Sequence, residues 1–215
     1  MRGRGHRRAG GAGLTYHVQE VFYSLQGEGV RAGTPNVFVR FAGCNMTCRQ
    51  ETHGFDCDTD FSSGIAYACD ELVALALSLV PAPQDCGVIF TGGEPALQLD
   101  RPLVAALDAA GFATMAIETN GSRNVDHLLL DWVTVSPKTA EHALRQRTAD
   151  EVKYVRHVHQ PVPKTQVEAT HYLISPAAEP DGTIRADTLR WCIALCKEHP
   201  PWRLSCQQHK TWGVR

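Results

Sequence analysis

The sequence predicts an α/β protein built around a mostly parallel sheet, and three observations support this. Short β-like runs alternate with helical patterns from Tyr16 onward, as in folds whose parallel strands are joined by helices. The 215 residues are 43% hydrophobic, enough for one sizeable core. No internal repeat and no linker divides the chain. Because the chain is shorter than the roughly 250 residues of a complete barrel, we expect an incomplete TIM-type barrel of about six parallel strands with helices outside. Periodicity alone leaves a doubly wound sheet as the alternative.

The individual elements follow in chain order. Strands are predicted at 18–23, 37–41, 87–91, 113–118, 132–136, 151–155, 172–175 and 202–206. Helical patterns occupy 70–80, 102–110, 124–129, 140–146 and 188–199. The second of these helices is the best marked, with Asp100 near its cap, Pro102 in its first turn and Gly111 just past its end.

The first 14 residues differ in composition from the rest. They are basic and glycine-rich without apolar periodicity, so we expect a disordered arm, followed by one domain over residues 15–215. No apolar stretch follows the arginines, which argues against a secretory signal peptide, and no run approaches the roughly 18 apolar residues of a spanning helix. The formal net charge of -2 gives no general attraction to nucleic acid or membranes. We therefore expect a cytoplasmic protein without a membrane or direct nucleic-acid partner.

Eight cysteines are many for a reducing compartment, and they favour metal or catalytic use over a disulfide framework. Cys44, Cys48 and Cys57 share one short polar segment. Three soft thiolates in one loop suit either zinc or an iron–sulfur cluster. His53 would complete a four-ligand zinc site, whereas three cysteines alone would leave one iron of a [4Fe–4S] cluster open. From the loop alone, both metals remain possible.

The scattered cysteines need no special explanation. Two of them, Cys192 and Cys196, are four residues apart in the last predicted helix and form a possible metal pair. We interpret them as ordinary buried thiols, since no further ligand is evident nearby.

Polar turns follow three further predicted strands, at the ends where parallel α/β folds collect their chemistry. These turns are 91–95 (TGGEP), 118–122 (ETNGS) and 136–138 (SPK). The glycine pair lets a ligand approach the backbone, and the Glu94 carboxylate with nearby carbonyls can accept hydrogen bonds from an ammonium group. Together with the cysteine loop, the turns predict one ligand site.

These segments resemble the radical S-adenosylmethionine (SAM) superfamily and, within it, the 7-carboxy-7-deazaguanine synthase family. The resemblance covers the chain from about Tyr16 to Arg215. It depends on the motifs 23–29 (YSLQGEG), 40–45 (RFAGCN), 57–61 (CDTDF), 91–95, 118–121, 136–138, 202–205 (WRLS) and 209–210 (HK).

The resemblance implies a carbon–nitrogen lyase that contracts 6-carboxy-5,6,7,8-tetrahydropterin to 7-carboxy-7-deazaguanine with loss of ammonia, in the pathway to queuosine and other 7-deazapurines. It implies a [4Fe–4S] cluster, SAM and Mg²⁺ as cofactors. The implied partners are the small pterin substrate, an electron donor such as a flavodoxin, and a second copy of the chain in a homodimer.

The resemblance also assigns residues. Cys44, Cys48 and Cys57 would hold the cluster and Thr59 the magnesium ion. The SAM contacts would be Gly93, Glu94, Ser136, Pro137, Lys138, Ser175 and Pro176. The substrate contacts would be Leu25, Gln26, Gly27, Glu28, Arg40, Thr91, Glu118, His209 and the terminal carboxylate of Arg215. One departure is the cysteine spacing, C-x8-C between Cys48 and Cys57 where the superfamily has C-x2-C; a loop can absorb the insertion at 49–56.

Two other functions fit parts of the sequence. A glycyl-radical-enzyme activase would share the cysteines and the 91–95 turn, but would not account for the segment from Gln26 to Glu28. A non-enzymatic zinc module would use the three cysteines and His53. An absorption band near 400 nm (about the position of an iron–sulfur thiolate chromophore) after anaerobic reconstitution would exclude the zinc module.

Overall fold

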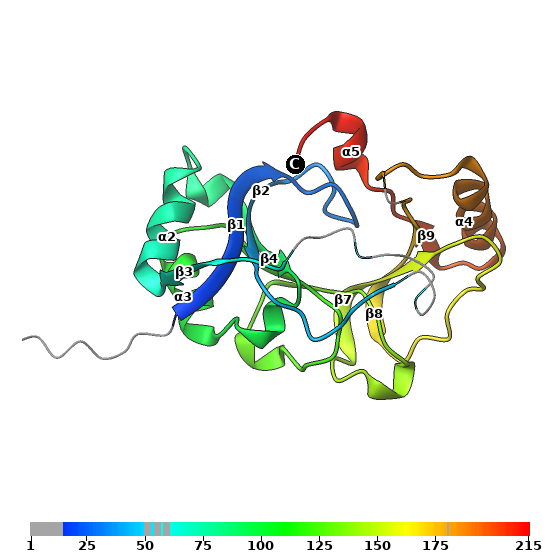
Figure 1. The fold of residues 1–215 in the computed structure, drawn as a ribbon, viewed down its shortest axis with the longest axis horizontal. Helices are drawn as coiled ribbons and strands as arrows, with labels where there is room; N and C mark the ends of the chain where they lie inside the picture. Colours follow the sequence, from blue (N-terminus) through cyan, green and yellow to red (C-terminus); the bar gives the residue numbers. More distant parts are fainter. Residues whose placement is uncertain (1–14, 50–52, 54–56, 58–60, 180) are drawn as a thin grey trace, which may run out of the picture.

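The computed structural model describes residues 15–49, 53, 57, 61–179 and 181–215. The 1–14 segment that we expect to be disordered, residue Thr59 and most of the 49–56 insertion lie outside the described residues. Figure 1 shows strands gathered into one curved sheet, with helices at both of its ends.

One sheet of nine strands runs through the described residues in the order β3-β1-β2-β4-β5-β6-β7-β8-β9. Its strands are β1 (Thr15–Leu25), β2 (Pro35–Phe41), β3 (Ile65–Ala68), β4 (Gly87–Gly92), β5 (Thr114–Thr119), β6 (Trp132–Val135), β7 (Thr148–Arg156), β8 (Glu168–Pro176) and β9 (Trp202–Leu204). Every pairing from β2 to β9 is parallel, whereas β1 is antiparallel to both of its neighbours. The predicted mostly parallel α/β fold is therefore confirmed.

All eight predicted strands are present, and β3 was missed. Seven strands share the parallel direction, one more than the six or so expected. The missed strand β3 is only four residues long and lies at the sheet edge beside β1. Its Ile65 and Ala66 are exposed, so the segment has no buried alternation that periodicity could detect.

Three of the predicted helices form, as α2 (Cys69–Ser78), α3 (Arg101–Ala109) and α4 (Ala186–Glu198). The Asp100 carboxylate accepts from the Leu103 N–H at 3.1 Å, as expected for the N-cap of α3. Four 3-10 turns (Pro83–Asp85, Pro95–Leu97, Asp126–Leu128 and Glu141–Ala143) and a five-residue helix, α5 (Gln208–Trp212), complete the described elements.

The predicted helices at 124–129 and 140–146 are wrong, since each contains only a three-residue 3-10 turn. Leu129 has a φ of 54°, which ends the first turn. The second ends because Gln146 is buried and uses its side chain elsewhere: its Nε2 donates to Asp126 Oδ1 at 2.7 Å and its Oε1 accepts from the Val125 N–H at 2.9 Å. These tertiary hydrogen bonds override local helix propensity.

The two faces of the sheet have different surroundings. On one face, alternate residues of β2 (Val37, Val39 and Phe41) pack in the main core with Leu72 of α2 and Leu103 of α3. On the other face, a smaller cluster consists of Phe22, Phe38, Ile89 and Ala116. Since successive strand residues point to opposite faces, the helices cover one face and leave the other available for a ligand.

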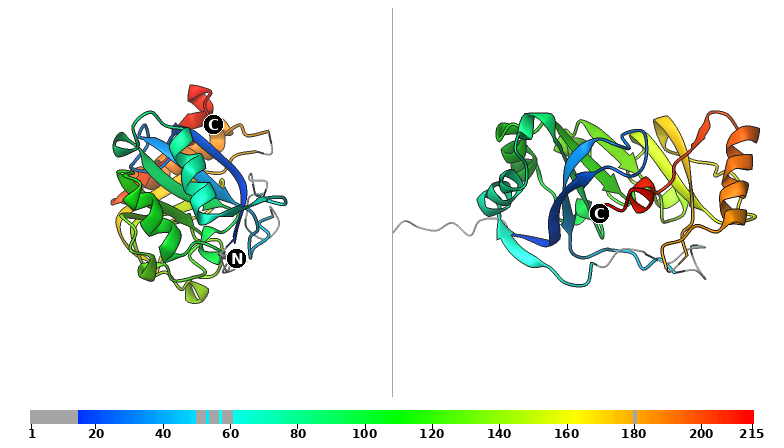
Figure 2. Two further views of the ribbon diagram at one scale, coloured as in Figure 1. Left: turned by 90° about the vertical axis from the view of Figure 1, so that its left-hand side faces the viewer. Right: turned by 90° about the horizontal axis from the view of Figure 1, so that it is seen from above.

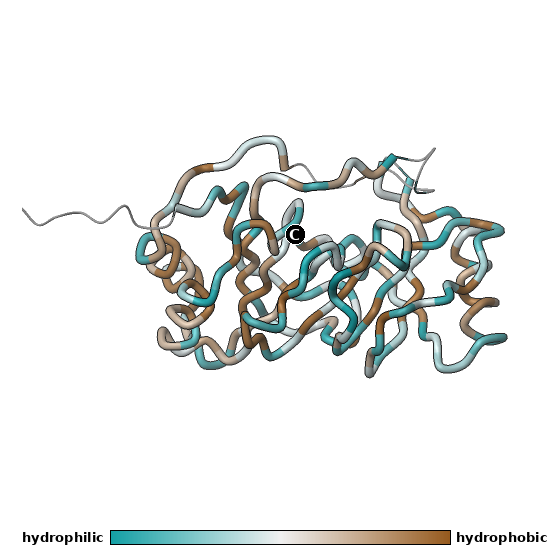
Figure 3. The backbone as a smooth tube through the Cα atoms, turned by 90° about the horizontal axis from the view of Figure 1, so that it is seen from below, coloured by the Kyte–Doolittle hydropathy of each residue, from teal (hydrophilic) through white to brown (hydrophobic). Residues whose placement is uncertain are grey.

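The helices occupy the two ends of an elongated molecule. Figure 2 shows α2 and α3 at one end, α4 at the other, and α5 with the chain's C-terminus between them. Along α4, hydrophobic and hydrophilic residues alternate (Figure 3), and the buried Cys192 and Leu195 pack on Ile174 of β8. None of the described helices combines the length and apolar character that spanning a bilayer requires.

A substitution in α3 tests the main core. Leu103 is fully buried, so Leu103→Ala should lower the free energy of unfolding by about 2–5 kcal/mol, from lost transfer energy plus a cavity. Leu77→Ala in α2 is the control, because Leu77 is 37% exposed and should cost about 1 kcal/mol or less. Equal losses in denaturant titrations would contradict this account of the core.

Candidate active site

A cavity of about 680 Å³ lies over the sheet face that the helices leave open. Its walls come from both ends of the parallel strands. Because β1 runs antiparallel to β2, the loop that follows it lies at the amino-terminal end of the parallel strands, whereas the cysteine loop follows the carboxyl end of β2. The predicted site residues that line it are Leu25, Gln26, Gly27, Glu28, Arg40, Cys44, Cys48, Cys57, Thr91, Gly93, Glu118, Ser136, Lys138, Ser175, Pro176, His209 and Arg215.

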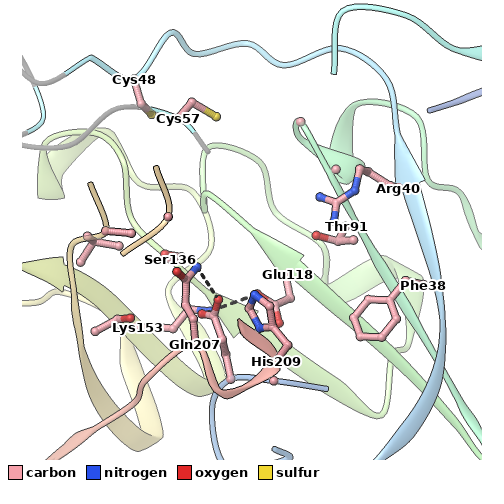
Figure 4. A pocket seen from close by; sticks show the side chains of 18 of the residues that line it. Phe38, Arg40, Cys48, Cys57, Thr91, Glu118, Ser136, Lys153, Gln207 and His209 are labelled. Atoms are coloured by element: carbon pink, nitrogen blue, oxygen red, sulfur yellow. Dashed lines mark hydrogen bonds and ion pairs between the residues drawn. The ribbon is translucent and has the colours of Figure 1, made fainter. Parts of the chain in front are cut away.

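The three loop cysteines contribute thiols to this cavity. Burial raises the pKa of the Cys44 and Cys48 thiols, and the neighbouring thiols raise both further, while Lys138 opposes the shift at Cys48. The Met46 N–H points at the Cys44 sulfur, 3.4 Å away. Figure 4 shows Cys48 and Cys57 on the opposite side of the cavity from Glu118 and His209.

The spacing of these thiols bears on which metal they suit. Among the described residues, no group of three or more His, Cys, Asp or Glu side chains lies close enough to share one metal ion. A zinc ion would need its thiolates within about 4 Å of one another, since each bonds the same ion at about 2.3 Å. In a cluster each thiolate bonds a different iron, so wider spacing is sufficient. The three thiols that line the cavity are the donor set of a cluster that leaves one iron open to a ligand.

Side-chain amides brace the cysteine loop against the turn after β5. The Asn120 Nδ2 donates to Asn45 Oδ1 at 3.0 Å, and the Asn45 Nδ2 donates to Ser122 Oγ at 2.9 Å. These bonds fix the start of the loop next to the Cys44 thiol.

The carboxylate of Glu94 lies beneath the turn after β5. It is fully buried and accepts hydrogen bonds from Thr119 Oγ1 at 2.7 Å, the Asn120 N–H at 2.7 Å and the Ala96 N–H at 2.9 Å. It does not line the cavity. The carboxylate therefore positions the turn after β5, and its assignment as a SAM contact stays a prediction.

Pro137 is also absent from the cavity wall, although both of its neighbours, Ser136 and Lys138, belong to it. Thr59, the expected magnesium ligand, lies outside the described residues.

Close backbone approach explains two of the motif glycines. A Cβ on Gly93 would overlap the Gly43 carbonyl oxygen and lie 3.0 Å from the Cys44 Cβ, so only glycine fits where the 91–95 turn meets the cysteine loop. A Cβ on Gly27 would overlap the His209 ring. The Gln208 N–H also donates to the Gly27 carbonyl at 2.8 Å, so α5 is held against the loop after β1.

A buried ion cluster forms the floor of the cavity below these loops. The Lys153 Nζ lies 2.5 Å from Glu28 Oε2 and 3.2 Å from Glu118 Oε2. Gln26 Nε2 donates to Glu118 Oε1 at 2.7 Å, and Gln207 Nε2 donates to Glu28 Oε1 at 3.0 Å. Burial raises the pKa of Glu28, but the ion pair with Lys153 and the neighbouring polar groups together have the larger effect and lower this pKa to about 2.

Aromatic and basic side chains form another part of the wall. Phe22 and Phe38 stack with centroids 4.9 Å apart, and Arg40 lies over the Phe22 ring with its Nε on Glu20 Oε1 at 2.9 Å. The Ser24 hydroxyl donates to the Arg215 carbonyl oxygen at 2.6 Å. Figure 4 shows Arg40 beside Thr91, away from Lys153.

Several residues of the cavity wall were not predicted from the sequence. They include Phe22, Phe38, Asn120, Lys153, Val155 and Gln207. The available signal was the alternation of the strands. Once Arg40 is placed on the cavity face, Phe38 shares that face of β2, and Lys153 and Val155 share one face of β7.

Comparisons with known proteins agree with this arrangement. A model described as a 4Fe-4S single cluster domain matches residues 25–129. The chain is 43% identical to a 7-carboxy-7-deazaguanine synthase of Burkholderia multivorans and 39% identical to one of Nitratidesulfovibrio vulgaris. Each match covers 94% of this chain and all of the relative. The fold is similar to the crystal structure of QueE from Escherichia coli, with a TM-score of 0.67 and 26% identity over 91% of this chain and 95% of the other.

The buried Glu94 carboxylate gives a stability prediction. Glu94→Ala leaves the Asn120 N–H and the Thr119 hydroxyl without their acceptor, which should lower the free energy of unfolding by about 2–4 kcal/mol. Glu168→Ala, at an exposed carboxylate, should change it by about 0.5 kcal/mol or less.

The pH dependence of the same group has a definite sign. Burial raises the pKa of Glu94, so its contribution is greatest at low pH and declines as the pH rises through the raised value. Glu94→Gln should remove that decline in denaturant titrations between pH 4 and pH 8; the same slope in both proteins would contradict the burial argument.

Proposed function

The chain belongs to the 7-carboxy-7-deazaguanine synthase family, and we propose which of its residues bind the cofactors and which bind the substrate. The reaction is the radical SAM ring contraction of 6-carboxy-5,6,7,8-tetrahydropterin to 7-carboxy-7-deazaguanine, with loss of ammonia, in queuosine and 7-deazapurine biosynthesis. One observation carries the assignment of roles: three thiols and a polar floor face each other across one cavity.

Cys44, Cys48 and Cys57 would hold the [4Fe–4S] cluster, and the nearby ends of β4, β6 and β8 would hold SAM. Gly93 lies in the cavity wall next to the cysteine loop, while Ser136, Lys138, Ser175 and Pro176 supply polar groups and a wall. When bound, these cofactors supply one-electron chemistry that begins with removal of a hydrogen atom from the substrate. The protein excludes water and fixes the substrate against them.

The other half of the cavity suits the pterin. Arg40 has the planar fork that matches a carboxylate, and the stacked pair Phe22 and Phe38 offers an apolar wall beside it. Gln26, Glu28 and Glu118 offer donors and acceptors for the edge of the ring. Leu25, Gly27, Thr91, His209 and Arg215 complete this proposed contact set.

Magnesium binding at Thr59 is a further part of the proposal. A hydroxyl oxygen and substrate carboxylate oxygens are the hard ligands that Mg²⁺ prefers. The ion would orient the substrate carboxylate through these oxygens.

Partners and location are proposed on separate grounds. Apolar side chains are exposed along β1 and near Arg215 (Tyr23, Leu25, Trp212 and Val214), and they support a homodimer. The described residues form no disulfide, which supports a reducing, cytoplasmic location with an electron donor such as a flavodoxin. We also propose that the sheet is an incomplete barrel, because its parallel strands follow chain order from β2 to β9 without the reversal of a doubly wound sheet.

The two alternative functions lose their support. The relatives with a synthase name cover 94% of the chain, including the Gln26–Glu28 segment that an activase does not require. The most direct test of the function is anaerobic reconstitution followed by an assay with the carboxypterin and SAM. Formation of 7-carboxy-7-deazaguanine is expected, and cluster-loaded protein that leaves the pterin unchanged would contradict it.

Deleting one cysteine tests the cluster assignment. Cys57→Ala should lose the absorption near 400 nm (about where iron–sulfur thiolates absorb) and all SAM cleavage, because only two loop thiolates remain. Cys69→Ala, outside the loop, should keep wild-type iron and sulfide content. Full iron content in Cys57→Ala would mean that another cysteine is the ligand.

The magnesium proposal has its own test. Thr59→Ala should keep the cluster but need more Mg²⁺ for half-maximal activity, since one hard oxygen ligand is removed. Activity is compared over a range of Mg²⁺ concentrations in the two proteins. Superimposable curves would remove Thr59 from the site.

A further inference from the structure

Lys153 is a buried cation that the assigned roles above do not use. Its side chain comes from the middle of β7 and is 5% exposed. Its Nζ is shared between Glu28, which follows β1, and Glu118 near the end of β5. These partners are 125 and 35 residues away along the chain, so the ammonium joins three separate segments at the cavity floor. Figure 4 shows Lys153 on the same side of the cavity as Glu118, Gln207 and His209.

Carboxylates outnumber ammonium groups in the cavity floor. One ammonium faces two carboxylates in the cavity wall. Behind them, Glu151 accepts from the Val30 N–H at 2.9 Å and from Thr134 Oγ1 at 2.9 Å, and Arg31 lies close enough to feel the charges of Glu151 and Glu118. His209 of α5 and Cys206 also lie within electrostatic reach of Glu28.

The hydrogen bonds leave acceptor capacity on both carboxylates. Each oxygen of Glu28 and Glu118 accepts a hydrogen bond from Lys153, Gln26 or Gln207. A carboxylate has about four lone-pair sites, so each can accept further hydrogen bonds from a molecule in the cavity. A ligand edge that carries donors would gain these bonds, and an edge that carries a carbonyl oxygen would be repelled.

We propose that Lys153 is a positioning residue that keeps Glu28 ionised and aligns it with Glu118, so that the two carboxylates select a ring whose edge carries N–H donors. The inference rests on the proposed function, under which the ring is the 2-amino-4-oxo pyrimidine of a pterin. That ring presents an exocyclic amino group and an adjacent ring N–H. Lys153 thereby acts on substrate selection through the carboxylates and leaves the hydrogen-abstraction chemistry to the cofactors.

The role of Lys153 as a charge is separable from its role in packing. Burial alone would raise the pKa of Glu28, and Lys153 is the main group that reverses this shift. Without the ammonium, burial would raise the pKa of Glu28, and the protonated carboxyl would donate a hydrogen bond. The donor-edge preference would weaken at low pH and return as the pH rises.

The test compares two stable ligands on the reconstituted enzyme with SAM bound. The ligands are 6-carboxypterin, with a 2-amino group, and 6-carboxylumazine, with a 2-oxo group in its place. Their Kd values are measured by calorimetry at pH 6.5, 7.5 and 9. The variants are Lys153→Met and, as a matched control, Lys164→Met at an exposed lysine outside the cavity wall. Iron content and the visible spectrum are recorded for each protein.

Wild type and Lys164→Met should prefer the pterin by about 100-fold or more at every pH, because a site built to hydrogen-bond a donor rejects an analogue that lacks it. In Lys153→Met the preference should fall at least tenfold at pH 6.5 and recover toward pH 9, with iron content unchanged.

If Lys153→Met does not fold, Lys153→Gln takes its place, because it keeps N–H donors toward both carboxylates but lacks the charge. Its preference for the pterin should also fall at pH 6.5 and recover toward pH 9. An unchanged preference with an unchanged pH profile in the folded neutral variant would overturn the inference. Failure of the wild type to bind 6-carboxypterin would instead count against the proposed function, so the two failures are distinguishable.

Discussion

The geometry of the site depends on one buried carboxylate. Loops at the carboxyl edge of a parallel sheet are covalently independent, and a ligand that touches several of them needs them cross-linked. Glu94 does this from the 91–95 turn, because its oxygens accept from Thr119 and Asn120 at the end of β5. Asn120 in turn bonds Asn45 beside the first cysteine. The cysteine loop is therefore held by the same network that holds the turns proposed to contact SAM.

A second constraint divides the cavity between two kinds of chemistry. Near the cysteines, Gly93 lets the 91–95 turn pack closely against the cysteine loop. On the opposite side, Lys153 joins carboxylates from two other segments and makes a rigid, polar floor. Because Gly27 admits the His209 ring against the loop after β1, the helix α5 covers this floor. Under the proposed function, the radical chemistry and the recognition of the substrate therefore come from different walls of one cavity.

Most of the fold could be predicted because its strands are long enough to show periodicity and its turns carry distinctive motifs. The elements that were missed or wrong depend on contacts far along the chain. The strand β3 exists through pairing with β1, and the predicted helix at 140–146 is replaced because the buried Gln146 bonds Asp126 and Val125. Among site residues, the motif glycines and cysteines were predictable. Lys153 was not, since a lysine in a strand shows its burial only once its distant carboxylate partners are placed.

The central claim is that cofactors and substrate meet in this one cavity, with the hydrogen atom taken directly from the pterin. The most direct test uses substrate that carries deuterium at C6. The reconstituted enzyme turns it over with SAM, and the mass of the 5′-deoxyadenosine formed is measured by mass spectrometry. The account predicts 5′-deoxyadenosine heavier by one deuterium. Unlabelled 5′-deoxyadenosine formed in step with product would contradict it.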